Sequence, residues 1–143
     1  MAGPNFSAEI ELDVPFHDLD PMGVVWHGRY AKYLELARCA LLATFDYDYP
    51  AMRESGYAWP VVELNVKYVR PLRYGQKFRV RADLLEWENR IKIGYLVVDA
   101  ATGERLTRAV TVQVAIEVAT GEMQFVSPAV LIDRLRRYDE GDR

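Results

Sequence analysis

Residues that bind metals or form disulfides are scarce in this 143-residue sequence, which holds one cysteine and two histidines. A single thiol excludes an internal disulfide framework, and so few ligands argue against a Cys/His zinc site. The formal net charge of −3 argues against a nucleic-acid-binding protein, which usually shows a basic excess. No apolar run approaches the ~20 residues that span a bilayer, and no secretory signal pattern opens the chain. We therefore expect a soluble, cytoplasmic protein without a membrane span.

Two common catalytic signatures are missing as well. The nine glycines never form a phosphate-cradling loop, and no serine lies in a nucleophile-elbow pattern. Cys39 lies among alanine and leucine in a helical pattern, which is typical of an inert, buried thiol. Carboxylates remain as the groups best suited to carry chemistry.

Alternation of apolar and polar residues predicts a sheet of antiparallel strands. Such segments occur at 8–16, 61–69, 78–87, 91–99 and 104–118, and short turns separate the later ones. In each of these strands the apolar residues share one face, which either fills the core or lines an acyl tunnel. These faces are Ile10, Leu12 and Val14; Val62, Leu64, Val66 and Tyr68; Phe78, Val80, Ala82 and Leu84; and Val110, Val112, Val114, Ile116 and Val118.

One long helical pattern, about 27–45, separates the first strand from the others. Its second half is apolar nearly all round, so we expect the sheet to wrap it. A short helix or turn is expected near 50–56. A C-terminal helix is expected at 127–138, with Ser127 as N-cap and Pro128 in the first turn. The whole chain, 1–143, then forms a single α+β domain.

The loop between the first strand and this helix holds the best-placed carboxylate, Asp20, in the sequence HDLDPMGVVWHG. A helix N-terminus offers unpaired N–H groups and the positive end of the helix dipole. An acid beside such donors can attack a carbonyl or activate water, while the N–H groups stabilise negative charge on the carbonyl oxygen. This arrangement predicts hydrolysis of an activated acyl group. The simpler alternative is that Asp20 caps the helix or forms a turn.

The polar neighbours of Asp20 also have structural interpretations. His27 is either a first-turn residue without a chemical role or a participant in proton transfer. Asp18 is expected to be a solvated or turn-forming group, and His17 to lie on the surface. Glu35 and Arg38, three residues apart, are expected to form an exposed ion pair.

The segment FHDLDPMGVVWHGRYAKYLELAR resembles the signature of hotdog-fold thioesterases of the 4-hydroxybenzoyl-CoA thioesterase family. VKYVRPLRYGQKFRVRADLLEW is similar to the family's second and third strands, so the resemblance covers nearly the whole chain. It implies the hotdog fold, an antiparallel sheet wrapped around one long central helix. It also implies hydrolysis of an acyl-CoA or acyl-carrier-protein thioester, with coenzyme A present only as part of the substrate. The family further implies a homodimer or homotetramer with active sites between subunits.

The resemblance assigns catalytic roles in the loop. Asp20 matches the family's catalytic carboxylate, which acts as nucleophile or general base. His27 lies where a backbone N–H polarises the thioester carbonyl, and Gly28 is a candidate to share this role. Phe16 stands where related acyl-CoA thioesterases of the Tol-Pal-associated type place a tyrosine, so it cannot donate a hydrogen bond there.

Substrate-binding candidates follow from the same resemblance. EWENRIK occupies the position of the family's CoA-binding turn, so Arg90 and Lys92 are candidate phosphate contacts and Trp87 a neighbouring one. Tyr30 is a candidate to line the acyl site, with the core as its alternative place. Two other functions stay open: a hotdog hydroxyacyl dehydratase and a non-catalytic acyl-binding protein.

Overall fold

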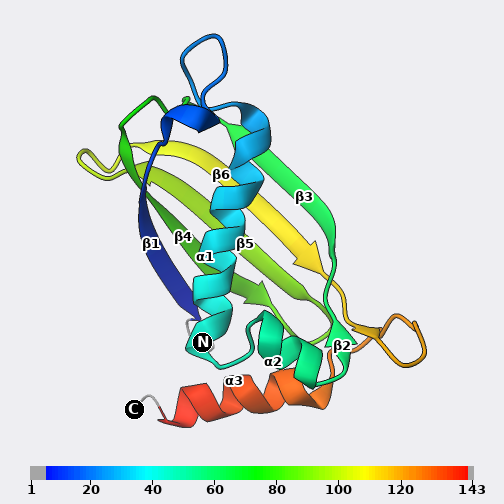
Figure 1. The fold of residues 1–143 in the computed structure, drawn as a ribbon. Helices are drawn as coiled ribbons and strands as arrows, with labels where there is room; N and C mark the ends of the chain where they lie inside the picture. The colour runs from blue at the N-terminus through cyan, green and yellow to red at the C-terminus, as the bar shows by residue number, and fades with distance from the viewer. Residues whose placement is uncertain (1–5, 142–143) are drawn as a thin grey trace.

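Five antiparallel strands form the main sheet of the structure, a computed structural model that describes residues 6–141 (Figure 1). The strand order is β1-β4-β5-β6-β3. Their bounds are β1 Ser7–Asp13, β3 Val61–Tyr68, β4 Lys77–Glu86, β5 Ile91–Asp99 and β6 Arg105–Gln113. A second, two-stranded sheet pairs β2 (Tyr57–Ala58) with β7 (Ile116–Glu117).

The long helix α1 (Tyr30–Thr44) lies across one face of this sheet (Figure 1). A 3-10 turn, η2 (His27–Arg29), leads into it, so the predicted helix is confirmed with a tighter first turn. A second 3-10 turn, η1, covers Phe16–Asp18. Two further helices, α2 (Tyr49–Glu54) and α3 (Ala129–Gly141), lie beyond the other end of α1.

The expected N-cap of the last helix is not formed. The Ser127 hydroxyl is buried without a hydrogen-bond partner, while the N–H of Leu131 donates to the Pro128 carbonyl over 3.1 Å. The first turn of α3 is therefore closed by backbone, and the Ser127 side chain contributes no cap.

The central strands confirm the predicted alternation. The apolar face of β4 is buried, and β5 presents a matching buried face toward α1. The core members of these two faces are Phe78, Val80, Ala82 and Leu84 on β4, and Ile91, Ile93, Tyr95 and Val97 on β5. The apolar side chains of these two adjacent strands thus belong to the core on the sheet face that α1 covers, and their burial stabilises the fold.

The apolar face that alternation gives for β6 does not face α1, although its member Val112 is buried. The register pairs Ala109 with Tyr95 and Thr111 with Ile93, and residues directly opposite share a face. Thr111, whose hydroxyl lies 2.7 Å from that of Tyr95, therefore faces α1, while Val110 lies on the other side. Both faces of β6 carry apolar residues, so alternation alone did not say which one faces the helix. The strand also ends at Gln113, before the apolar residues that belong to β7.

The apolar face of β3 is largely exposed within this chain. Val62, Leu64 and Tyr68 are 53%, 50% and 49% exposed, and only Val66 packs against the core. β3 is an edge strand, and α1 packs mainly against β1 and β4 at the opposite side of the sheet. The chain therefore leaves an apolar strand with an unpaired edge, which is typical of an interaction surface.

Candidate active site

The loop from Leu19 to Trp26 is closed by its own hydrogen bonds. The N–H of Asp20 donates to the Val24 carbonyl over 2.8 Å, and the N–H of Gly23 donates to the Asp20 carbonyl over 3.0 Å. Gly23 has φ +80°, a conformation that residues with a side chain rarely adopt. The loop thus forms a short hairpin that projects from the end of the sheet (Figure 1).

The Asp20 carboxylate is part of this hairpin. Its Oδ1 accepts hydrogen bonds from the N–H groups of Met22 (2.8 Å) and Val24 (3.4 Å), so the turn-forming interpretation is confirmed. Its Oδ2 accepts no hydrogen bond from residues 6–141, and the side chain is half-buried. One oxygen therefore fixes the carboxylate, and the second accepts no hydrogen bond in that part of the chain.

The turn that begins α1 presents unused backbone donors. The N–H of Arg29 donates to the Trp26 carbonyl, and the N–H of Tyr30 donates to the His27 carbonyl. The N–H groups of His27 and Gly28 have no acceptor within the described part of the chain. They lie at the positive end of the helix dipole, as expected for groups that stabilise an oxyanion.

An indole covers this turn. A Cβ at Gly28 would lie 2.4 Å from a ring carbon of Trp26, so the close packing is possible because residue 28 has no side chain. The guanidinium of Arg29 lies 5.8 Å from the centre of the same ring. Trp26 itself is 45% exposed, so it shields the Gly28 backbone from one side and remains open to solvent on the other.

Asp18 is buried, which corrects the expectation of a solvated group. Its carboxylate accepts hydrogen bonds from Lys32 Nζ (2.8 and 3.0 Å) and from the Tyr33 hydroxyl (2.5 Å), both on α1. Burial by itself raises the pKa of Asp18, but these bonds and the Lys32 charge outweigh it and lower the pKa below its usual value. Its carbonyl also accepts the N–H of Trp26 over 2.9 Å. Asp18 therefore ties the loop to α1, while His17 beside it is exposed as predicted.

The expected ion pair on α1 is present, but it is not exposed as predicted, because its arginine is buried. Arg38 is 5% exposed, and its Nη2 lies 3.5 Å from Glu35 Oε2, a long contact to an exposed carboxylate. Its Nε donates to the Tyr49 hydroxyl over 3.0 Å, and its Nη1 approaches the Tyr95 hydroxyl at 3.5 Å. Arg38 therefore points into the space between α1 and the sheet, where tyrosine oxygens solvate its charge.

Three of the substrate-binding candidates lie far from Asp20. Trp87 packs edge-on against Phe6, and Arg90 forms two hydrogen bonds with the Glu86 carboxylate (3.2 and 3.3 Å). These residues and Lys92 are at the β4–β5 turn, whereas the Asp20 loop follows the other end of β1. The seven residues of β1 span about 24 Å, so one chain does not bring the two groups together.

Tyr30 lies near the loop but is enclosed. It is 2% exposed, and its hydroxyl accepts the Leu72 N–H over 3.3 Å. Tyr30 therefore packs in the core of this chain, which was its alternative place, and a contact with the acyl group stays a prediction. Cys39 is half-buried and burial raises the pKa of its thiol, in line with an inert group.

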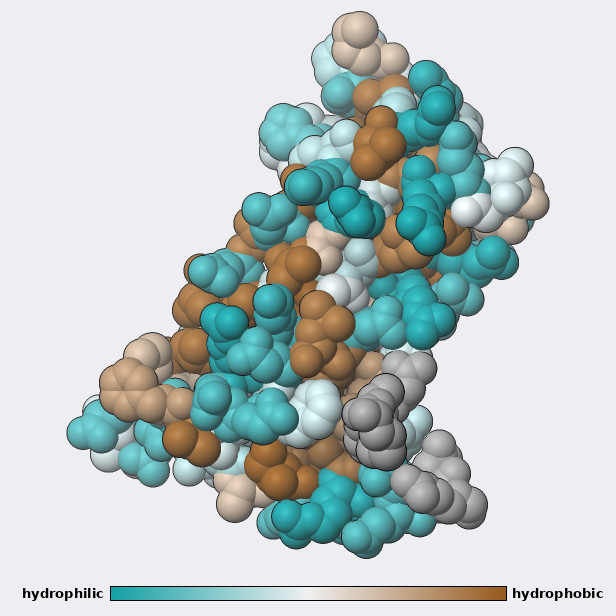
Figure 2. Space-filling view, turned by 180° about the vertical axis from the view of Figure 1, so that it is seen from behind, coloured by the Kyte–Doolittle hydropathy of each residue, from teal (hydrophilic) through white to brown (hydrophobic). Residues whose placement is uncertain are grey.

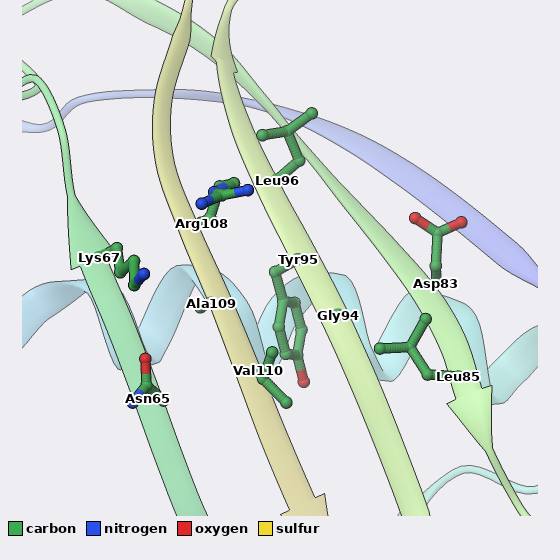
Figure 3. A pocket seen from close by; sticks show the side chains of 10 residues that line it. All are labelled: Asn65, Lys67, Asp83, Leu85, Gly94, Tyr95, Leu96, Arg108, Ala109 and Val110. Carbon is green, nitrogen blue, oxygen red and sulfur yellow. The ribbon is translucent and has the colours of Figure 1, made fainter.

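Two hollows lie away from the loop. An apolar groove of about 450 Å³ is lined by Tyr49, Met52 and Trp59, near the start of β3. A second hollow, of about 340 Å³, lies over Gly94 on the sheet face turned away from α1 (Figure 3). Seen from behind, that face mixes apolar and polar side chains (Figure 2). The second hollow holds none of the predicted site residues.

Metal-binding clusters and membrane-spanning helices are absent from residues 6–141. Among residues 6–141 no group of three or more histidine, cysteine or acidic side chains is arranged to hold a metal ion. None of the helices in that range has both the length and the apolar character needed to cross a membrane.

Comparison with known proteins gives the family. Residues 14–133 match the family model described as the thioesterase-like superfamily. The chain belongs to this superfamily. The predicted resemblance to hotdog-fold thioesterases and the α+β hotdog fold are thereby confirmed.

Its relatives carry related names. A protein of Synechocystis sp., named "Putative esterase sll0410", is 34% identical over 134 residues, which are 89% of this chain and 77% of that protein. An Arabidopsis thaliana acyl-acyl carrier protein thioesterase, ATL3, is 38% identical over 74 residues, 52% of this chain and 39% of its own length.

Solved structures agree with the fold. The DHNA-CoA thioesterase of Staphylococcus aureus is 27% identical with a TM-score of 0.76, over 82% of this chain and 78% of its own. A mutant of 4-hydroxybenzoyl CoA thioesterase, complexed with 4-hydroxybenzoyl CoA, has a TM-score of 0.78 over 90% of this chain and 98% of its own. At 20% identity, the second likeness concerns the fold alone.

Proposed function

We propose that this protein is a thioesterase that hydrolyses an acyl-CoA thioester to a carboxylic acid and a free thiol. The observation that carries the proposal is the Asp20 carboxylate, held through Oδ1 with Oδ2 unoccupied, in the loop that leads to the free N–H groups of His27 and Gly28. A nucleophile or base beside unpaired helix N-terminal donors is the minimum that acyl transfer requires. The names of the relatives support the same reaction.

The reaction has two forms that use the same residues. As nucleophile, Asp20 Oδ2 attacks the thioester carbon, the thiolate leaves, and water hydrolyses the resulting anhydride. As general base, Asp20 takes a proton from water while the water oxygen attacks the carbon. In both forms the N–H groups of His27 and Gly28 donate hydrogen bonds that stabilise the negative charge on the carbonyl oxygen. We propose that the imidazole of His27 orients water or protonates the leaving thiolate.

A second copy of the chain is proposed to complete the site. The exposed Val62, Leu64 and Tyr68 lie on an edge strand, where a two-fold axis would pair β3 with β3 and continue the sheet. Antiparallel pairing sets the Tyr68 end of one strand beside the Val61 end of the other. The partner's apolar groove, which lies near the start of β3, would then face the Asp20 end and receive the acyl group. The partner's β4–β5 turn, with Arg90 and Lys92, would move to that same end.

The homodimer has its own test. Leu64→Lys adds a charge to the proposed interface, and we expect a monomer in sedimentation analysis, together with a large loss of thioesterase activity. Leu36→Lys, at an exposed leucine on α1, is the matched control and is expected to keep the wild-type mass. A wild-type protein that sediments as a monomer would remove this part of the proposal.

The activity is tested by measuring the release of free thiol with a disulfide reporter. The substrates are short, long and aromatic acyl-CoAs and an acyl-carrier-protein thioester. Asp20→Asn is the variant of choice because an asparagine Oδ1 can still accept the Met22 and Val24 N–H groups. Asp133→Asn, at an exposed acid on α3, is the control. We expect turnover in wild type and control and its loss in Asp20→Asn.

Other outcomes would change the assignment. Enoyl absorbance without thiol release would favour the hydroxyacyl dehydratase, and binding of acyl-CoA without turnover would favour an acyl-binding protein. Equal turnover in Asp20→Asn would remove the catalytic role of Asp20. A cytoplasmic location suits an acyl-CoA substrate and remains a prediction.

A further inference from the structure

We propose that Tyr68 is a positioning residue that fixes and polarises the His27–Gly28 peptide group, an inference that rests on the proposed thioesterase function. The Tyr68 hydroxyl donates a hydrogen bond to the His27 carbonyl over 3.1 Å. Tyr68 is the last residue of β3, so this bond joins the edge strand to the turn that begins α1. It connects two segments that lie 41 residues apart in the sequence.

The bonded carbonyl and the proposed oxyanion donor belong to one peptide unit. The carbonyl of His27 and the N–H of Gly28 are the two ends of the same planar group, and they point in opposite directions. The carbonyl accepts two hydrogen bonds, from the Tyr68 hydroxyl and from the Tyr30 N–H. The N–H at the other end has no acceptor within residues 6–141. Hydrogen bonds therefore fix the oxygen end of the peptide unit, and the N–H at its other end is left without a partner in that range.

Two donors on the oxygen make the nitrogen end a better donor. Hydrogen bonds in a chain polarise one another, by roughly 10–30% per bond. The Tyr68 bond therefore draws electron density toward the His27 oxygen and makes the Gly28 N–H more positive before substrate binds. It also removes rotation of the peptide plane, so that no reorganisation is needed when charge develops on the thioester oxygen.

Ring packing holds the Tyr68 hydroxyl in place. The Tyr68 ring packs edge-on against Tyr30, with centroids 5.0 Å apart, and against the His27 imidazole at 6.4 Å. The Trp26 indole covers Gly28. A phenylalanine at position 68 would keep the ring contacts and lose only the hydrogen bond. Tyr68→Phe therefore isolates the contribution of one hydroxyl.

The first measurement does not depend on activity. In protein labelled with [13C′]histidine and [15N]glycine, the Gly28 amide is identified by its coupling to the His27 carbonyl carbon, because His27–Gly28 is the one histidine–glycine pair in the sequence. We expect Tyr68→Phe to move the Gly28 resonance further than the other glycine resonances. Tyr74→Phe is the matched control, because Tyr74 is an exposed tyrosine that packs on Phe16 and its hydroxyl has no hydrogen-bond partner within residues 6–141. Tyr74→Phe is expected to leave the Gly28 amide resonance at its wild-type position.

The second measurement is the split between kcat and KM for the best thioester. Loss of one positioning hydrogen bond is expected to lower kcat by roughly 3- to 10-fold, with KM, melting temperature and oligomeric mass unchanged. A merely structural role would lower the melting temperature and leave kcat per folded molecule as it was.

Three results would overturn the proposal. An unmoved Gly28 resonance in Tyr68→Phe would show that the hydrogen bond is not formed in solution. A moved resonance with unchanged kcat, where Asp20→Asn is inactive, would show that the bond has no part in catalysis. Absence of thioesterase activity in the wild type would remove the proposed function itself, and the resonance shift would then report a structural bond only.

Discussion

Asp18 and Asp20 lie two residues apart and have the same side chain, but they differ in exposure and in hydrogen-bond partners. Asp18 is 1% exposed and receives hydrogen bonds from Lys32 and Tyr33 on α1. Asp20 is half-buried, receives N–H groups of its own loop on one oxygen, and keeps the other oxygen free. The bonds of Asp18 reach another element and those of Asp20 remain local.

We propose that this difference separates a structural acid, Asp18, from a catalytic one, Asp20. A carboxylate whose oxygens are both engaged by a lysine and a tyrosine is a weak nucleophile and a weak base, because attack or protonation would require those bonds to break. A carboxylate that accepts hydrogen bonds through one oxygen is held in a fixed orientation, and its other oxygen can still react. The loop therefore uses its first acid to hold its position on α1, and we propose that it uses the second to react.

The largest expected effect is on turnover. Asp20→Asn is expected to lower kcat by roughly 10²- to 10⁴-fold, while its free energy of unfolding stays within about 0.5 kcal/mol of wild type. Stopped-flow or steady-state thiol release measures the first quantity, and urea unfolding measures the second. A strongly destabilised Asp20→Asn would show that this acid is as structural as its neighbour.

Asp18→Asn should show the reverse pattern. Replacing the charged acceptor leaves Lys32 without its counter-charge and weakens the Tyr33 bond, so we expect a loss of about 1.5–3 kcal/mol in the free energy of unfolding. Urea unfolding at neutral pH measures it, and the turnover of the folded fraction should fall much less than in Asp20→Asn. Unchanged stability would contradict the anchoring role assigned to Asp18.

The smallest expected effect is a pH dependence of that stability. The folded-state pKa of Asp18 lies below its usual value of 3.8, so its contribution is fully present above that value and is lost as pH falls through the folded pKa. The difference in unfolding free energy between wild type and Asp18→Asn should therefore be largest at about pH 7 and shrink at about pH 3. A difference that grows as the pH falls would show that folding raises the pKa of Asp18 instead of lowering it.

Much of the fold could be predicted from local patterns. Period-two alternation located β1, β3, β4, β5 and β6 to within a few residues, and helical spacing located α1. These signals depend only on which residues share a face, a property that the backbone geometry of one element determines. The candidate loop was found in the same way, because it precedes a helix N-terminus and contains an acid.

Burial was predicted less well, because it depends on what packs against an element. Leu64 alternates as regularly as Val80, but α1 covers β4 and does not extend over β3. Arg38 has an exposed acid three residues before it, yet the helix turns its guanidinium toward two tyrosines. No local pattern encodes the position of a tyrosine more than fifty residues away.

The sequence by itself determined the elements, their order, and the loop in which an acid precedes free helix N–H groups, since these follow from nearest neighbours along the chain. Only the tertiary structure decided that Asp18 is the anchor and Asp20 the acid with a free oxygen. It alone also decided that Tyr68 lies on the His27 carbonyl and that β3 remains open at its edge. These features depend on contacts between segments that are distant in sequence, and the way in which α1 packs on the sheet determines those contacts.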